Sequence, residues 1–409
     1  MSRRARPNRR SYPRFPDAEY ERRWRRVRDL LDDRNLDAML VYADGGFAAH
    51  NVAYLSNYAP SFATYLVAFA DPGESATLFL GLNNHLQYAA ERAVIDDLRV
   101  LLPDPARRVA ARLQEARTDV DRVGIAGYDA RYRLSLPHEH HRTLDGRLDA
   151  DLVDVTVPYA RLVATKSEAE LDRIRRAADL LDGAMAALER DAAPGRSERD
   201  LVRALRDGAS DPEGGVTTTF LSTAPMEGAE PGEPLPWKHR PTARTVDRGD
   251  VITTEVSAAY RGYATQIHRP YAVGTGPTET YRDLYAATRV TYDAMLDAIE
   301  PGATTADVAD ALAPLVESPF KGYDVALHGY GGGYGPPHVG TPDAGYWPGI
   351  DDPATEGWTF EPGEVLVVQP NAVTRDERCG LQVGTTVVVT DDGAEPLHDY
   401  PLRFTTIHD

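Results

Sequence analysis

The chain of 409 residues has a single cysteine, Cys379, and this scarcity excludes several classes of structure. One thiol cannot build a disulfide framework or a zinc site made of several cysteines. No apolar run approaches the roughly 18–20 residues that a transmembrane helix requires. The first residues are basic but lack the apolar core of a secretory signal. These absences predict a cytoplasmic protein that does not enter a membrane.

Lysine is scarce as well, because only Lys166, Lys238 and Lys321 contribute to the 45 basic side chains. The 63 acidic side chains outnumber these and give a formal net charge of -18. Such a charge disfavours binding to nucleic acid or to anionic membranes. An acidic, lysine-poor surface is typical of halophilic proteins, although GC-rich coding would also favour arginine over lysine. The Arg- and Pro-rich residues 1–15 are expected to form a disordered basic tail.

The order of periodic segments predicts two domains. Between residues 16 and 160, apolar strand-like runs alternate with amphipathic helical segments, which predicts an α/β domain with a mixed sheet. Ser167 and Glu170 have the spacing of a capping box at the start of a long helix, and this helix start marks the boundary. Residues 161–409 combine long helices with strand-like runs, which predicts an α+β domain with a largely antiparallel sheet.

The stretch EVSAAYRGYATQIHR (255–269) predicts a β-hairpin that carries polar side chains where apolar ones are expected. Gln266 and His268 are two residues apart and therefore share one face of a strand. A buried polar row costs free energy unless it is hydrogen-bonded or used in function. Any one such residue is more often a satisfied core residue, but their recurrence on several strands favours an active-site floor. These polar positions are His239, Glu255, Gln266, His268, His328, Gln369 and Gln382.

His239 is the strongest candidate for acid–base catalysis, because an unperturbed imidazole titrates at about pH 6.5. Glu255 could orient this imidazole or hold a cationic group of a substrate. HEHH (138–141) is expected to be a solvated loop rather than a metal site, since adjacent histidines do not all converge on one ion. The Gly-rich turn 329–335 lacks the spacing and the lysine of a phosphate-binding loop.

Several segments resemble, in chain order, motifs of the creatinase/prolidase/aminopeptidase P family. WKHRPTARTVDRGD (237–250) is similar to its HY-x-P-T-x-R run, and GYATQIHRPYAVG (262–274) to its GY-x-S-D-I-T-R hairpin. EPGEVLVVQPNAV (361–373), GLQVGTTVVVTDDG (380–393) and NVAYLSNY (51–58) resemble further motifs. The resemblance implies a C-terminal pita-bread domain, an antiparallel sheet with long helices, preceded by a creatinase-type N-terminal domain.

The resemblance also locates the family's metal site. Mapped by motif, its five ligand positions fall on Glu255, Gln266, Gly332, Gln369 and Gly384. Glutamine is a poor substitute for a bridging carboxylate, and glycine supplies no side chain. The resemblance therefore implies no metal centre of the usual kind and no cofactor, and it points to the metal-free creatinase-like branch.

The main prediction is a metal-independent hydrolase of a C–N bond in a small amidine, guanidine or amide compound, similar to creatinase or ectoine hydrolase. His239 would serve as the general acid and base, with Glu255 and His268 completing the catalytic set. The side chains expected to bind this small-molecule substrate are Gln266, Gln369, His328, His338 and Phe62.

Two alternatives stay open. One is an atypical metal-dependent Xaa-Pro peptidase whose metal is held by Glu255, His268, His328 and His338. The other is a non-catalytic pita-bread binding protein. The resemblance also implies a homodimer in which the second subunit's N-terminal domain closes the site near Tyr58–Tyr65. That segment lacks the arginine with which creatinases bind a carboxylate, and Phe62 is expected to line the pocket instead.

Overall fold

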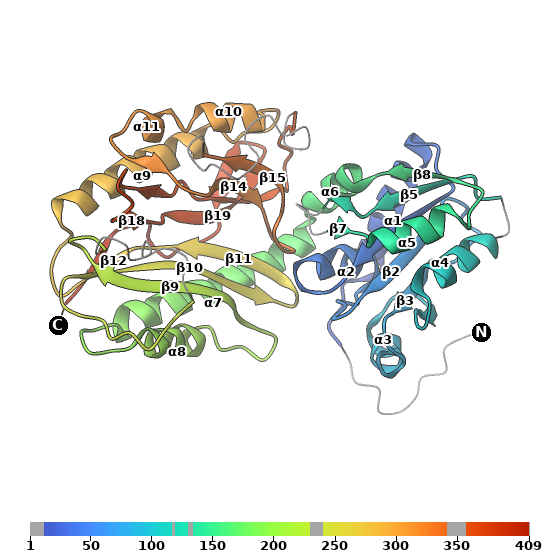
Figure 1. Cartoon of the computed structure of the whole chain (residues 1–409), viewed down its shortest axis with the longest axis horizontal. Coiled ribbons are helices and arrows are strands. Elements are labelled where there is room, and N and C mark those ends of the chain that lie inside the picture. The colour runs from blue at the N-terminus through green and yellow to red at the C-terminus, as the bar shows by residue number, and fades with distance from the viewer. Residues whose placement is uncertain (1–11, 117–118, 130–133, 230–239, 342–356, 409) are drawn as a thin grey trace. The chain divides into compact units, whose positions relative to one another are not determined.

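The computed structural model describes residues 12–116, 119–129, 134–229, 240–341 and 357–408 (Figure 1). The chain divides into two compact units, Met1–Val163 and Ala164–Asp409, and each is described by itself. Within the described ranges, every helix is too short or too polar to cross a bilayer.

The first unit is built on a six-stranded mixed sheet with the order β4-β3-β2-β1-β5-β8. β1 (Ala38–Ala43) is antiparallel to β2 (Thr64–Phe69) and parallel to β5 (Arg122–Ala126). All six residues of β1 are buried, because its continuous apolar run suits a strand covered on both faces. The other elements are α1 (Asp17–Asp33), α2 (Ala49–Ser56), β3 (Thr77–Leu80), α3 (Leu86–Arg92), β4 (Asp97–Val100), α4 (Pro105–Gln114), β6 (Tyr128–Asp129), β7 (Leu134–Ser135), β8 (Asp151–Asp154) and α6 (Thr156–Ala164).

The HEHH segment is helical, so the prediction of a loop there is wrong, although His138 and Glu139 are exposed to solvent as predicted. It opens α5 (His138–Asp145), which follows Pro137. The helix is held because Leu144 is buried in the core of the first unit. One of the histidines is also tied down, since Nδ1 of His140 lies 2.6 Å from the hydroxyl of Tyr65.

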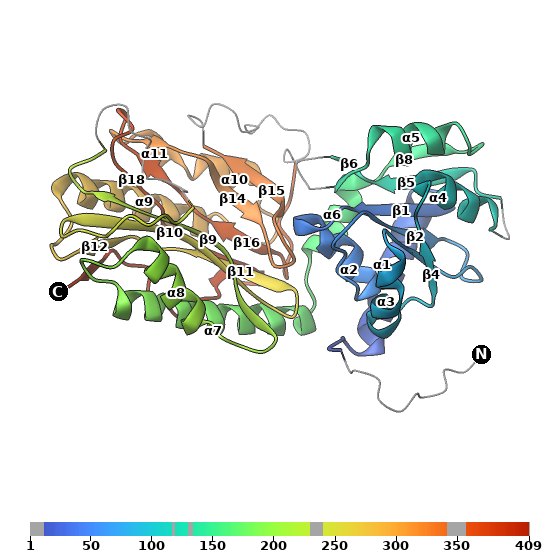
Figure 2. The same cartoon turned by 60° about the horizontal axis from the view of Figure 1, so that its bottom comes forward.

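The second unit places long helices against a large sheet, as the predicted pita-bread architecture requires (Figure 1). α7 (Glu168–Asp191) and α8 (Glu198–Gly208) both begin at capping boxes, headed by Ser167 and Ser197. In both views these two helices lie along the same side of the strands from β9 to β11 (Figure 2). A second core joins α9 (Glu279–Asp297) to the strands on the other part of the sheet. Two short helices follow, α10 (Thr305–Asp310) and α11 (Ala313–Val316).

The large sheet has the order β15-β14-β16-β19-β11-β10-β12-β21, with β9 added on β10 and β20 on β19. All of its neighbours are antiparallel except the parallel pair β12 and β21. Its strands are β9 (Gly214–Pro225), β10 (Asp250–Tyr260), β11 (Tyr263–His268), β12 (Tyr271–Val273), β14 (Val325–Gly329), β15 (Gly335–Gly340), β16 (Val365–Val368), β19 (Gly384–Thr390), β20 (Gly393–Pro396) and β21 (Thr405–Ile407). A small separate sheet joins β13 (Lys321–Gly322), β17 (Ala372–Val373) and β18 (Gly380–Leu381).

The expected hairpin is formed by β10 and β11. Its turn is Arg261-Gly262, and both residues have positive φ, 48° and 84°. Two consecutive left-handed residues match the two-residue turns that favour glycine and suit the twist of paired strands. The turn sets the register, in which Tyr260 faces Tyr263 and Ser257 faces Gln266. This register brings polar side chains of the two strands together on one face.

Candidate active site

A chain of hydrogen bonds links polar side chains from three strands of the large sheet. Nε2 of Gln266 on β11 donates to Oε1 of Glu255 on β10 at 3.1 Å and to Oγ of Ser257 at 3.3 Å. Oε1 of Gln266 lies 3.2 Å from Nε2 of His328 on β14. Gln382 donates its own amide to the second carboxylate oxygen of Glu255 at 3.2 Å. All five side chains are buried, and we call them the Glu255 cluster.

The carboxylate determines which way the Gln266 amide points. An ionised carboxylate only accepts hydrogen bonds, so the amide nitrogen faces Glu255 and the amide oxygen faces His328. The other ring nitrogen of His328, Nδ1, lies 3.1 Å from the carbonyl oxygen of Gly329. A neutral imidazole donates to one of these two oxygens, whereas a protonated ring donates to both. The His328 ring therefore lies between two acceptor oxygens, those of the Gln266 amide and the Gly329 carbonyl.

Two tyrosines extend the cluster. The hydroxyl of Tyr330 donates to Oγ of Ser257 at 3.0 Å. Burial of this phenol, together with the nearby charge of Glu255, raises the pKa of Tyr330 to about 12 despite the hydrogen bond to Ser257. The ring of Tyr334 lies 4.5 Å from that of His328 and 4.9 Å from that of His338. His338 on β15 faces His328 across the strand pair, so Tyr334 contacts both imidazoles.

The other predicted residues form a second group around Gly384, which we call the Gly384 group. His268 at the end of β11 faces Gly384 at the start of β19. A Cβ added to Gly384 would lie 2.8 Å from Cβ of Gln369 and 3.0 Å from Cδ2 of His268. The volume that a side chain at position 384 would need is therefore already filled. The amide of Gln369 turns to the backbone, donating to the carbonyl of Val325 at 2.9 Å.

Arg269 fixes the Gly384 group through backbone carbonyls. Its Nη1 donates to the carbonyl of His268 at 2.9 Å and to that of Gly384 at 2.6 Å. Further bonds reach the carbonyls of Pro401 and Tyr400. Burial lowers the pKa of this guanidinium to about 10. One buried cation thus holds the ends of β11 and β19 in place.

Five of the predicted site residues do not enter the Glu255 cluster, and two of them, Gln369 and His338, have been placed above. His239 lies outside the described residues. Phe62 belongs to the first unit, where its side chain is 50% exposed and its ring lies 5.4 Å from that of His85. His268 is fully buried beside Gly384. The structure thus joins Glu255, Gln266 and His328 by hydrogen bonds. The sequence could not predict these contacts, because the alternation of polar residues shows only which side chains of one strand share a face.

Ser257 and Tyr330 were missed by the sequence analysis, although a signal existed for each. Ser257 is two residues after Glu255 and so shares its face of β10. Tyr330 follows His328 in HGYG, which has the histidine and glycine order of the family's GHGIG motif. The imidazole in the cluster therefore comes from His328, four residues before Gly332, the position to which the motif was mapped.

The donor atoms do not fit the paired metal site of the resembled family. Among the described residues, no group of three or more His, Cys, Asp or Glu side chains could hold a metal ion. The Glu255 cluster offers one carboxylate and one imidazole, and an amide lies between them. The position of the missing ligand at Gly384 is filled by His268 and Gln369. The alternative metal set of Glu255, His268, His328 and His338 is likewise not assembled in these parts of the chain.

Sequence profiles of known families match both units. The profile of the creatinase/prolidase N-terminal domain matches residues 23–162, and that of metallopeptidase family M24 matches residues 172–391, more than half of the chain. The chain belongs to metallopeptidase family M24. This membership confirms the family and the fold that the motifs predicted.

Relatives of this M24 protein have been named as peptidases. A Xaa-Pro dipeptidase of Pyrococcus furiosus is 21% identical over 90% of this chain and 95% of its own length. A probable dipeptidase PepE of Mycobacterium tuberculosis is 27% identical over 65% of this chain and 67% of its own length. The crystal structure of the prolidase from Pyrococcus horikoshii has a TM-score of 0.71 at 18% identity, covering 94% of this chain and 99% of that one.

These relatives contradict the predicted function. A metal-independent, creatinase-like hydrolase of an amidine, guanidine or amide is wrong as the main reading, because the matching curated proteins are named Xaa-Pro dipeptidases and dipeptidases of a metallopeptidase family. The prediction gave too much weight to the missing ligands. The other motifs, which extend over most of the chain, are those that the protein shares with the peptidases.

Proposed function

We propose that this M24 protein is a peptidase-type hydrolase that cleaves the C–N bond of small dipeptides, with Xaa-Pro dipeptides as the substrate class. The observation that carries the proposal is the match to named Xaa-Pro dipeptidases over about nine-tenths of the chain. The buried polar cluster on the sheet of the M24 unit supports it, because it holds a carboxylate and an imidazole, two groups able to exchange protons, in fixed positions.

In this proposal the Glu255 cluster forms the polar floor of the site. Gln266 and Gln382 each donate to one oxygen of Glu255, and the carboxylate is thereby held in a single orientation. A fixed carboxylate can accept a proton from water or bind the ammonium group of a dipeptide. No step is assigned to a metal, because the described donor atoms do not fit the family's metal pair.

Hydrolysis of a panel of Xaa-Pro and other dipeptides tests the proposal. The assay is run on the purified full chain with added Mn²⁺, Co²⁺ or Zn²⁺ and with a chelator, and bound metal is measured in the same samples. Glu255→Gln is expected to lower kcat at least about 100-fold, since it removes the proton acceptor. Glu300→Gln, at an exposed carboxylate, is the matched control and should match the wild type. The absence of turnover of every dipeptide under all metal conditions would overturn the proposal.

A non-catalytic binding protein is a second candidate, and one observation favours it. Only one of the five mapped ligand positions keeps a carboxylate, and the cluster's polar groups already satisfy one another. This candidate predicts saturable binding of dipeptides in calorimetry without any product. Binding without turnover in wild-type protein, lost in Glu255→Gln, would support it over the peptidase.

Three further expectations belong with these proposals. His239 is expected to act as acid and base, so His239→Ala should remove turnover at saturating dipeptide. Phe62 is expected to line the pocket, so Phe62→Ala should raise KM more than it lowers kcat. Homodimerisation is tested by light scattering during gel filtration, and a monomer at micromolar concentration would contradict it.

A further inference from the structure

Arg240 lies beside β9, on the face of the large sheet that carries the Glu255 cluster. Its guanidinium carbon is 4.8 Å from the centroid of the Phe220 ring, a distance typical of a cation–π contact. Phe220 on β9 pairs with Glu255 on β10, and residues that pair directly across two strands point to the same face of a sheet. The guanidinium and the carboxylate therefore share one face.

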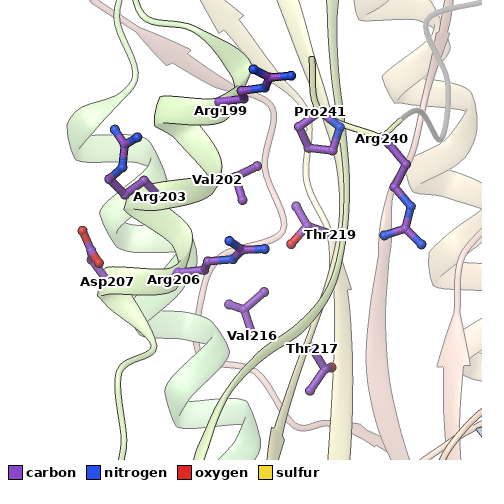
Figure 3. Close-up of a pocket in the computed structure, with 10 residues that line it drawn as sticks. All are labelled: Arg199, Val202, Arg203, Arg206, Asp207, Val216, Thr217, Thr219, Arg240 and Pro241. Atoms are coloured by element: carbon purple, nitrogen blue, oxygen red, sulfur yellow. The ribbon is translucent and has the colours of Figure 1, made fainter. Parts of the chain in front are cut away.

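The residue after Phe220 gives independent support for this placement. Leu221 belongs to the hydrophobic core that also contains Leu201 and Leu205 of α8. Because side chains alternate along a strand, Phe220 points away from α8. Arg240 also borders a hollow between α8 and β9, but Figure 3 shows its side chain across β9 from the arginines of α8.

The charge of Arg240 is available to a ligand. No carboxylate of the described residues forms an ion pair with it, whereas Arg244, four residues further on, pairs with Asp250 at 2.6 Å. The N–H groups at the rim of a stacked guanidinium can still bind an anion. Arg240 is exposed to solvent, and its contact with Phe220 reduces the side-chain freedom that binding would otherwise remove. An anion would therefore meet a preorganised arginine on the face of Glu255.

Phe220 thus has an anionic and a cationic neighbour on one face. Cβ atoms of directly paired residues are about 5 Å apart, so the Glu255 side chain lies next to that of Phe220. The guanidinium of Arg240 contacts the same ring. An extended dipeptide spans about 7 Å from its ammonium group to its carboxylate. The two charged side chains around this ring therefore match the two charged ends of a dipeptide in sign and in approximate spacing.

We propose that Arg240, held by Phe220, binds the free carboxylate of the substrate and thereby selects dipeptides over peptides with a blocked C-terminus. The planar fork of a guanidinium matches the two oxygens of a carboxylate. Glu255 then faces the ammonium end of the dipeptide. This role of Arg240 rests on the proposed dipeptide substrates and adds a specificity-determining residue outside the hydrogen-bonded cluster. It concerns recognition, so it holds for hydrolysis and for binding without turnover.

Calorimetric titration of the full chain with Ala-Pro and with Ala-Pro amide tests this role. The amide keeps every group of the dipeptide except the charged carboxylate. We expect Ala-Pro to bind at least about tenfold more tightly than its amide. Arg240→Gln should weaken binding of Ala-Pro about tenfold and leave binding of the amide unchanged. Arg240→Lys should restore only part of the loss, because an ammonium group lacks the planar fork.

Two variants on α8 and β9 serve as controls. Arg199→Gln removes an exposed arginine on the opposite side of β9, so binding of Ala-Pro should not change. Phe220→Leu keeps apolar surface but removes the ring that the guanidinium contacts, and its loss should be smaller than that of Arg240→Gln. Equal Tm values without ligand show that the variants are folded. Where Ala-Pro is hydrolysed, kcat/KM replaces affinity as the measured quantity.

Equal affinity of the wild type for Ala-Pro and its amide, no binding of either, or equal losses in Arg240→Gln and Arg199→Gln would overturn the role of Arg240. Failure of the proposed peptidase function is seen separately. Tight binding of Ala-Pro without any hydrolysis would overturn the peptidase and support the carboxylate site, whereas hydrolysis of the acid and the amide at equal kcat/KM would do the reverse.

Discussion

The Glu255 cluster and the Gly384 group are the two halves of the polar region on the large sheet, and their buried polar groups are hydrogen-bonded in different ways. In the Glu255 cluster, the amides of Gln266 and Gln382 donate to one carboxylate, and the Gln266 amide also contacts the His328 imidazole. In the Gly384 group, the Gln369 amide donates to a backbone carbonyl, and Arg269 binds the carbonyls of both strands. The first half keeps groups that can exchange protons. The second half is packed too closely to accept a new side chain.

This difference explains why the missing metal ligands argued against a relationship to the peptidases, whereas the retained motifs argued for one. Loss of a ligand at position 384 is accompanied by side chains that fill its space, so the change is structural as well as chemical. Retention of Glu255 and His328 keeps the hydrogen-bonding centre of the other half. The following substitutions compare the two halves, in order of decreasing effect on the free energy of unfolding.

Arg269→Met should have the largest effect. It removes a buried cation that binds four backbone carbonyls and leaves those oxygens without a donor. We expect a loss of about 4 kcal/mol or more in urea unfolding. Arg269→Lys, which keeps the charge but reaches fewer carbonyls, should recover only part of this loss. Equal stability of the methionine variant and the wild type would contradict the role of Arg269 in holding the ends of β11 and β19 in place.

Glu255→Ala should lower the free energy of unfolding by about 3 kcal/mol, because two buried amide donors lose their acceptor. Chemical denaturation of the purified variant measures this loss. Glu300→Ala, at an exposed carboxylate, should stay within about 0.5 kcal/mol of the wild type. A similar loss in both variants would show that the hydrogen bonds of Glu255 in the cluster add nothing to the free energy of unfolding.

Gly384→Ala should cost about 2 kcal/mol, because the new Cβ would lie 2.8 Å from Gln369 in a filled space. Gly276→Ala is the matched control, since a Cβ there meets no atom within 4 Å. The difference in Tm between the two variants measures the crowding. If Gly384→Ala behaved like the control, position 384 could accept a side chain and the packing account of the missing ligand would fail.

The same substitution in each half provides a direct comparison. Gln266→Leu removes the amide that joins Glu255 to His328 and should cost about 1.5 kcal/mol. Gln369→Leu loses one bond to the Val325 carbonyl but also removes an Oε1 that lacks a hydrogen-bond partner among the described residues, so its net cost should be smaller. The urea midpoints of the two variants show which glutamine contributes more to stability. A larger loss of stability in Gln369→Leu would contradict the conclusion that side-chain hydrogen bonds matter more in the Glu255 cluster than in the Gly384 group.

Tyr330→Phe should have the smallest effect at neutral pH, about 1 kcal/mol for the lost bond to Ser257. Its pKa of about 12 lies above the usual value near 10, so the unfolded chain releases this proton at a lower pH than the folded protein. Stability from Tyr330 is therefore complete below pH ~10 and falls as the pH approaches 12. The difference between wild type and variant should shrink over this interval, and a constant difference from about pH 8 to about pH 12 would contradict this role of Tyr330.

The sequence predicts the fold well because its signals are local. Capping at Ser167 and the turn at Arg261-Gly262 depend on neighbouring residues, and the order of motifs carries the family. Period-two polarity also places Gln266 on a shared face with His268. The sequence does not predict that Gln266 bonds to His328 or that His268 fills the space at Gly384, because those contacts depend on registers between strands 60 to more than 100 residues apart.

The HEHH segment shows the same limit of local information. Its helix is held by the burial of Leu144 in the core of the first unit, a contact that the local sequence does not reveal.

β9 carries a bulge at Thr217, because Thr218 pairs with Ser257 and Val216 with Ala258, which leaves Thr217 as the extra residue. The strand is 12 residues long and rich in β-branched side chains, and its partner strand within the described residues is β10. The other edge of such a strand can template the addition of strands from other chains. The extra residue breaks the even spacing of backbone donors and acceptors, and this irregularity disfavours growth of the sheet into aggregates.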